Sequence, residues 1–323
     1  MGKKIVNSII FLAGLAAILV LTSHFLKPND DVYNTNGVMA KKEEFQKETN
    51  DTIDVIFIGD SEVYSAYNPM QLYGNYGFTS YDLATSAQRL CDTYSILKSM
   101  YKTQTPEYIF IETNCFFRFG GSIDATKDRF MNFVLNRIPA MKYHTRLKNF
   151  FFNEKTKDHE YMKGFVLRNN VEPYTGGEWM QYTNEAEPVD ECNVEYINKI
   201  VTLAKEHNTK IIFVSTPSPE CHSYKKHNAV VNFANDHGID YYDFNLVADK
   251  IGIDWSKDTR DGGNHLNFKG AIKVTDYLGK IMKSELNLKD HRNENGYEKW
   301  QNYYEKYLCL LYTSDAADDS LRV

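Results

Sequence analysis

Short runs of apolar residues recur along the chain, and most end at a Gly or a polar residue. They predict strands over residues 54–59, 79–84, 107–113, 210–215 and 239–244. The run Asp54-Val-Ile-Phe-Ile-Gly59 is apolar on both faces, which is typical of a strand buried within a parallel sheet. The predicted core is therefore a parallel sheet rather than a one-sided antiparallel one.

Helical patterns of apolar and polar positions lie between these runs. They cover residues 86–101, 194–207, 224–237 and 268–286. Strands that alternate with helices indicate βαβ units, with helices on both faces of a parallel sheet. The predicted fold is thus a three-layer α/β/α domain, in which ligands bind at the carboxyl ends of the strands.

Residues 116–190 interrupt this alternation without a clear parallel-strand run. We predict that they form a mainly helical insertion covering the strand ends.

The first residues carry a different pattern. Lys3 and Lys4 precede an almost unbroken apolar run over residues 5–21, and about 20 residues of helix cross a bilayer core of roughly 30 Å. The positive-inside bias predicts a single-pass plasma-membrane protein with a cytoplasmic N-terminus and an extracellular domain. A cleaved signal peptide is the alternative, but no small-x-small site follows the run, which favours a retained anchor.

These patterns divide the chain into segments. Residues 1–27 are predicted to be a cytoplasmic tip and signal anchor, 28–50 a stalk, 51–290 the catalytic domain and 291–308 a helical tail. Residues 309–323 resemble the in-frame translation of a sequencing-library adaptor, and we predict that they are an adaptor-derived artefact.

Composition narrows the class of protein. The formal net charge of −6 gives no support for nucleic-acid binding. The cysteines before residue 309 are Cys91, Cys115, Cys192 and Cys221. They form no CxxC pair, so they are buried free thiols or, in an exported domain, a disulfide. His and Cys lack metal-ligand spacing, and we predict neither a metal nor a cofactor.

Two segments combine into candidate chemistry. Ser61 follows the first predicted strand, where its hydroxyl would lie at the mouth of the sheet. A serine at its ordinary pKa is a poor nucleophile and needs a nearby base. His265 can supply that base, because it lies on a loop just before the last predicted helix, with Asn267 as the expected helix cap. The alternatives are a Ser61 that only caps a helix and a His265 that is an ordinary loop histidine.

Gly59-Asp60-Ser61 and the later block Asp261-x-x-x-His265-Leu-Asn267-x-x-Gly270-Ala271 resemble the first and last blocks of the SGNH (GDSL-like) hydrolase superfamily. The resemblance covers roughly residues 54–286 and implies a flavodoxin-like α/β/α fold. It makes Ser61 the nucleophile and His265 the base.

The sequence departs from that family in two places. The family acid stands three residues before the histidine, where this chain has Gly262, so Asp261 is the expected acid, with Asp258 further back. Asp261 could also be only a turn residue. For the oxyanion donors, Asn114 matches the family asparagine by position, and Ser86 stands only loosely near the family glycine. Asp60 and Asn264, beside the nucleophile and the base, are further candidates for substrate contacts.

The resemblance implies acyl transfer through an acyl-serine. The anchor and outward domain look like the accessory proteins of cell-surface polysaccharide O-acetylation and teichoic-acid D-alanylation. We therefore expect an O-acyltransferase, most simply an acetyltransferase, acting on a cell-envelope glycan beside a membrane-bound O-acyltransferase partner. An extracellular carbohydrate esterase and a catalytically silent glycan-binding scaffold are the alternatives.

Overall fold

The computed structural model describes residues 2–26, 38–118 and 160–320. Within them, five parallel strands form one sheet in the order β2-β1-β3-β4-β5. The strands are β1 (Val55–Gly59), β2 (Ser80–Ala84), β3 (Tyr108–Glu112), β4 (Lys210–Ser215) and β5 (Asp240–Asp243). Each lies within one residue of its predicted limits, so the predicted parallel sheet is confirmed.

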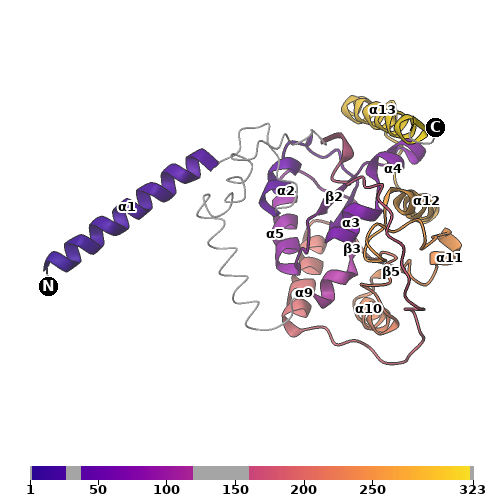
Figure 1. Ribbon diagram of the computed structural model, residues 1–323, viewed down its shortest axis with the longest axis horizontal. Helices are drawn as coiled ribbons and strands as arrows, with labels where there is room; N and C mark the ends of the chain where they lie inside the picture. The colour runs from indigo at the N-terminus through magenta and orange to yellow at the C-terminus, as the bar shows by residue number, and fades with distance from the viewer. Residues whose placement is uncertain (1, 27–37, 119–159, 321–323) are drawn as a thin grey trace.

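Alternate residues of the strands build two separate cores. In β1, Ile56 and Ile58 join one buried cluster, whereas Val55 and Phe57 join the other, as the period of two along a strand requires. The first face is covered by α2 (Val38–Phe45), α5 (Leu90–Met100), α9 (Glu191–Glu206) and α10 (Tyr224–His237). The second is covered by α3 (Ser61–Ala66), α11 (Ala248–Ile251) and α12 (Phe268–Glu285). The three-layer α/β/α prediction is confirmed, and the layers separate in Figure 1.

Two helix boundaries differ from the sequence pattern. Helix α5 begins at Leu90 rather than at residue 86, because Gln88 closes a turn onto Thr85 and Ala87 has a positive φ of 51°. Helix α9 begins earlier than predicted because Asp190 caps it by accepting a hydrogen bond from the backbone N–H of Cys192.

The N-terminal apolar run forms α1 (Gly2–Leu26). Its segment Lys3–Thr22 is 20 residues long and apolar enough to cross a membrane, and none of it is buried against the rest of the structure. Length and composition alone also fit a signal sequence.

The predicted stalk and insertion look different where the structure describes them. Residues 38–50 pack against the domain: Phe45 is buried and Glu48 forms a buried ion pair of 2.6 Å with Lys163. In the insertion, only η2 (Glu160–Met162) is helical among residues 160–190. The helical prediction is therefore wrong for this part, and residues 119–159 lie outside the described residues.

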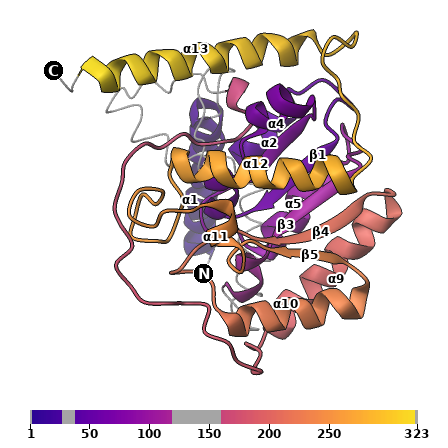
Figure 2. The same ribbon diagram turned by 90° about the vertical axis from the view of Figure 1, so that its right-hand side faces the viewer.

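We call residues 163–190 the strap. The strap contains two prolines and two consecutive glycines, which disfavour a helix. Its backbone instead bonds to the loop that carries the candidate base: the N–H of Glu172 donates to the carbonyl of Thr259, and that of Gly262 donates to the carbonyl of Glu172. Figure 2 shows this long irregular segment running around the edge of the domain.

Two further helices lie beside the β2 edge, α4 (Pro69–Tyr76) and α13 (Glu298–Ser320). Trp300, Tyr303 and Tyr307 of α13 are buried in the first core cluster. The predicted helical tail at 291–308 thus begins at Glu298, and the helix continues beyond residue 308.

Candidate active site

Ser61 is placed by a tight passage from β1 into α3. A Cβ at Gly59 would lie 2.7 Å from the Cβ of Glu112 and 2.9 Å from the Cγ2 of Val63, so only glycine fits there without displacement. Asp60 then caps α3, accepting a 3.0 Å hydrogen bond from the backbone N–H of Glu62. The cap starts the helix at Ser61, which fixes the serine at the carboxyl end of β1.

His265 comes to the same point from the far end of the domain. Asn267 caps α12 by accepting from the backbone N–H of Gly270, as the sequence predicts, and this cap holds the preceding loop. The Nε2 of His265 lies 2.7 Å from the Oγ of Ser61, although the two residues are 204 positions apart. The hydroxyl and the imidazole are therefore within proton-transfer distance.

Asp261 is the third member of a row of hydrogen-bonded side chains that also contains Ser61 and His265. Its Oδ2 lies 2.6 Å from the Nδ1 of His265, and its Oδ1 accepts a 2.7 Å hydrogen bond from the backbone N–H of the same residue. The extra residue relative to the family spacing is absorbed in a loop where Gly262 and Gly263 have φ of +70° and +98°. These are values that glycine adopts readily. Asp258 instead pairs with Lys273 and accepts from the backbone N–H of Asp254.

The charge and hydrogen bonds of Asp261 suit His265 to act as a base. Burial alone would raise the pKa of the Asp261 carboxyl, but hydrogen bonds from the His265 ring and backbone, with the charges of His265 and Arg260, bring it below its ordinary value. An ionised Asp261 accepts a hydrogen bond from the Nδ1–H of His265 and so leaves the Nε2 lone pair facing the Ser61 hydroxyl. The arrangement can remove the serine proton as the oxygen attacks a carbonyl.

Asn114 and Asp60 lie behind the serine. The Nδ2 of Asn114 donates to the Oδ2 of Asp60 at 3.1 Å, and the Nε of Arg118 lies 2.5 Å from the same oxygen. Asp60 is fully buried. The structure therefore makes Asp60 a support for α3, Asn114 and Arg118 and gives it no surface for substrate contact, contrary to the sequence-based interpretation. Asn114 keeps a second amide hydrogen that Asp60 does not occupy.

Ser86 and Asn264 are less directly connected. Ser86 is exposed and its Oγ lies 2.9 Å from the hydroxyl of Tyr64. The Oδ1 of Asn264 accepts from the Sγ of Cys221 at 3.0 Å. Within the described residues, neither side chain has a hydrogen bond to Ser61 or His265. The turn at residues 85–88, which delays α5, holds Ser86 on the surface.

Two buried glutamates near the nucleophile were not predicted from the sequence. Glu62 and Glu112 are 1% and 2% exposed. Burial, followed by the charge of Asp60, raises the pKa of both carboxyls well above their ordinary range. Both shifts favour the uncharged form of these carboxyls. The available signal was an acidic residue directly after Ser61 and another ending an apolar strand, but sequence alone does not reveal that both point inward.

The cysteines are free thiols: Cys91 and Cys115 are buried, and Cys192 and Cys221 are half-buried. The structure thus supports the free-thiol alternative over a disulfide among them.

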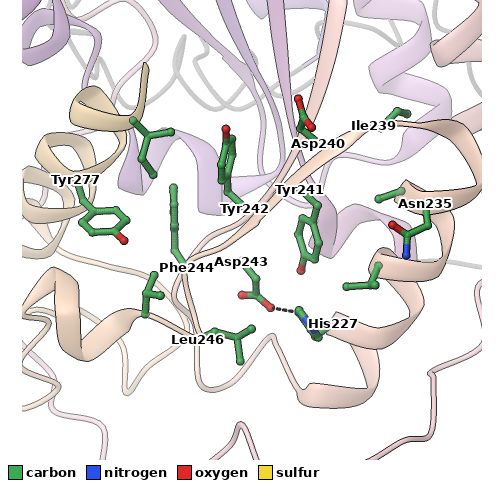
Figure 3. A pocket seen from close by; sticks show the side chains of 14 residues that line it. His227, Asn235, Ile239, Asp240, Tyr241, Tyr242, Asp243, Phe244, Leu246 and Tyr277 are labelled. Atoms are coloured by element: carbon green, nitrogen blue, oxygen red, sulfur yellow. Dashed lines mark hydrogen bonds and ion pairs between the residues drawn. The ribbon is translucent and has the colours of Figure 1, made fainter. Parts of the chain in front are cut away.

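A second polar group lies at the end of β5. Asp243 Oδ2 is 3.0 Å from the Nε2 of His222 and 2.8 Å from the Nδ1 of His227. His227 borders a pocket of about 510 Å³ between α10, β5 and α12 (Figure 3). This pocket includes neither Ser61 nor His265. In the part of the chain that the structure describes, no three His, Cys, Asp or Glu side chains are arranged to hold a metal ion.

From the contacts of Asp243 we predict a contribution to the free energy of unfolding that is lost at acid pH. Burial would raise the pKa of Asp243, but the charge of His222 and the hydrogen bonds from His222 and His227 lower it below its ordinary value. Because its pKa is lower in the folded state, ionised Asp243 stabilises the fold at pH values above its unfolded-state pKa of about 4. This stabilisation is lost as the pH falls toward the folded-state pKa. Asp243→Asn should lower the free energy of unfolding by about 2–3 kcal/mol at pH 7. Urea unfolding should show a smaller difference from the unchanged protein at pH 3; an equal difference at both values would contradict this assignment.

The solved structures similar to this chain include proteins described as an acylhydrolase, a GDSL-like lipase and a lipase/acylhydrolase. A GDSL-like lipase from Bacteroides thetaiotaomicron is 12% identical and covers 78% of this chain and 100% of its own, with a TM-score of 0.41. The lipase/acylhydrolase from Enterococcus faecalis is 11% identical over 73% of this chain and 99% of its own, with a TM-score of 0.36. The Clostridium thermocellum family 3 carbohydrate esterase is 14% identical over 73% and 96%, also with a TM-score of 0.36. No protein-family model and no curated protein matches the sequence.

Proposed function

We propose that this protein is a serine enzyme that moves acyl groups through an acyl-Ser61 intermediate. One observation carries the proposal: the uninterrupted row from the Oγ of Ser61 through the imidazole of His265 to the carboxylate of Asp261, with links of 2.7 and 2.6 Å. A serine aligned with an oriented imidazole is the arrangement that activates an alcohol toward acyl carbons.

The two half-reactions follow from this row. The Oγ of Ser61 attacks the ester carbonyl while its proton passes to the Nε2 of His265. The ester C–O bond then breaks, and the departing alcohol takes that proton. In the second half, an acceptor hydroxyl gives its proton to His265 as it attacks the acyl carbon. The bond between that carbon and the Oγ of Ser61 then breaks, and His265 passes the acceptor's proton to Ser61. The second amide hydrogen of Asn114 is the side-chain donor we propose for the developing oxyanion.

For the acceptor we propose a sugar hydroxyl of a cell-envelope glycan, which makes the protein an O-acyltransferase. The apolar helix α1 supports this role, because a retained anchor would hold the domain at the outer membrane face, where a membrane-bound O-acyltransferase partner could deliver acyl groups. Water is the second candidate acceptor and would make the protein a carbohydrate esterase. The side chain of Asp261 is 35% exposed, so solvent reaches the edge of the row.

Trapping the intermediate tests the shared chemistry. The full-length protein in detergent, mixed with 4-nitrophenyl acetate and quenched in acid, should gain one acetyl group on the peptide that contains Ser61, as measured by mass spectrometry. An acetyl group found only on other residues, or an equal release of nitrophenol by the Ser61→Ala variant, would remove the basis of the proposal.

Adding acceptors separates the two candidate reactions. For a transferase, an oligosaccharide should speed breakdown of the acyl-enzyme and yield acetylated sugar. Hydrolysis that is unaffected by the oligosaccharide, with acetate as the sole product, would favour the esterase. In cells, surface acetylation that is unchanged by Ser61→Ala would favour the silent scaffold.

A further inference from the structure

Three large aromatic residues meet on the strap and the loop after α11. We call Tyr174, Trp179 and Trp255 the aromatic cluster. The ring centroids of Trp179 and Trp255 are 5.1 Å apart at 83°, and Tyr174 lies 6.0 Å from Trp179 and 6.3 Å from Trp255. All three side chains are half-buried, so part of each ring faces solvent.

The aromatic cluster adjoins the loop that carries the base and its acid. A Cβ at Gly263, between Asp261 and His265, would lie 2.7 Å from the Cδ2 of Tyr174. The indole Nε1 of Trp179 lies 3.2 Å from the Oδ1 of Asn245, which also accepts from the backbone N–H of Ser218. Asn245 follows β5 and Ser218 follows β4, so the cluster is on the same rim of the sheet as Ser61.

Packing in the hydrophobic core does not account for the positions of Tyr174 and Trp179. Among the residues that the structure describes, Trp255 packs against the second core cluster, but Tyr174 and Trp179 pack against neither. Tyr174 donates its hydroxyl to the carbonyl of Gly177, and Trp179 donates its indole N–H to Asn245. With their polar atoms already bonded, what these rings offer a ligand is apolar surface in a fixed orientation.

The charge of the strap restricts the ligand. Residues 169–190 contain no Lys or Arg and carry Glu172, Glu178, Glu185, Glu187 and Asp190. Glu185 is paired with Lys225 and Asp190 caps α9, so the charge that would disfavour an anionic polymer comes from the acids on either side of Tyr174 and Trp179, Glu172 and Glu178. An uncharged pyranose ring suits this segment, because its C–H face can lie on an aromatic ring while its hydroxyls donate to the nearby carboxylates.

We infer that the aromatic cluster is a subsite that holds an uncharged pyranose ring of the glycan beside the acyl-transfer site. This inference rests on the proposed function, and it names the substrate class and the residues that recognise it. Trp179 is the binding residue best suited to a test, because Tyr174 packs directly on the loop of Asp261 and His265.

Kinetics on large and small esters tests the subsite. Trp179→Ala in the full-length protein should raise the KM for an acetylated xylohexaose about tenfold, which corresponds to about 1.4 kcal/mol of lost binding free energy. Its kcat, and both constants for phenyl acetate, should stay within about twofold. Trp179→Phe should have a KM close to that of the unchanged protein.

Tyr182→Ala is the matched control, because Tyr182 is an exposed aromatic residue of the same strap that contacts Tyr224 instead of the aromatic cluster. It should leave both substrates unaffected. Equal losses on the sugar ester and on phenyl acetate would show that Trp179 only holds the strap, and an unchanged KM for the sugar ester would also overturn the inference.

A binding measurement separates this inference from the proposed function. Unacetylated xylohexaose should bind the Ser61→Ala variant, detected by calorimetry, and binding should weaken about tenfold when Trp179→Ala is added. Hexagalacturonate, an anionic probe, should bind more weakly than xylohexaose. If acetyl-Ser61 forms but xylohexaose does not bind, the subsite fails alone; if xylohexaose binds in a Trp179-dependent way but acetyl-Ser61 never forms, the subsite stands and the enzymatic proposal fails.

Discussion

Ser61→Ala should lower kcat for an acetyl ester by about 10⁴-fold or more, because it removes the hydroxyl that lies against the Nε2 of His265 and is placed to form the acyl intermediate. The fold should be unaffected: Asp60 still caps α3 through the backbone of Glu62, and Ser65 bonds to the carbonyl of residue 61, which alanine keeps. Initial rates with 4-nitrophenyl acetate, with melting temperatures measured in parallel, give the comparison.

A serine far from the site provides the control. Ser284 is exposed on α12, with its hydroxyl bonded to the carbonyl of Ile281. Ser284→Ala should retain full activity. A Ser61→Ala variant with a tenth or more of the original rate would mean that another group attacks the ester, and the row of side chains described here would then be structural.

The sheet could be predicted from sequence because its signal is local. A run such as Val55–Gly59 is apolar at each position, and a strand buried on both faces requires that pattern regardless of which strands lie beside it. The strap had no such local signal. Its conformation depends on hydrogen bonds between Glu172 and the loop at residues 259–262, which are contacts between distant parts of the chain.

Some residues of the site could likewise be predicted from local sequence, and others could not. Ser61 and His265 could be predicted because each stands beside a recognisable strand end or helix cap. The position of Asp261 follows from its spacing only once Gly262 and Gly263 are known to turn with positive φ. Asp60 was misread because a carboxylate beside a nucleophile suggests substrate contact. Only three-dimensional packing shows that it is fully buried and bonded to Asn114 and Arg118.

The buried carboxyls show what sequence leaves out. A glutamate such as Glu62 is exposed in most helices, and its placement inward here depends on how α3 lies between β1 and α12. Burial raises the pKa of Glu62 and so favours its uncharged form, whereas the pKa of Asp261, which bonds to the His265 ring, is lowered. The electrostatics of the site therefore depend on burial, which the residue order does not encode directly.

Asp261→Asn should lower kcat by about 10²- to 10⁴-fold while the ester still binds. Asp261 now accepts two N–H groups of His265, one per oxygen, and asparagine has one accepting oxygen for both. If its amide N–H faces the Nδ1, the imidazole proton moves to Nε2, and that nitrogen can no longer take the proton of Ser61. Steady-state rates from pH 5 to 9 should show a loss at every pH, because the defect is in proton position rather than in titration.

Asp258→Asn is the comparison that identifies the acid. Asp258 is buried and bonds to Lys273 and to the backbone N–H of Asp254, but it does not contact His265. Its replacement should lower the free energy of unfolding by about 2 kcal/mol and leave kcat within about threefold. The reverse result, with kcat lost in Asp258→Asn and kept in Asp261→Asn, would show that the loop rearranges in solution and that the spacing of Asp261, one residue longer than in the family, prevents it from orienting the base.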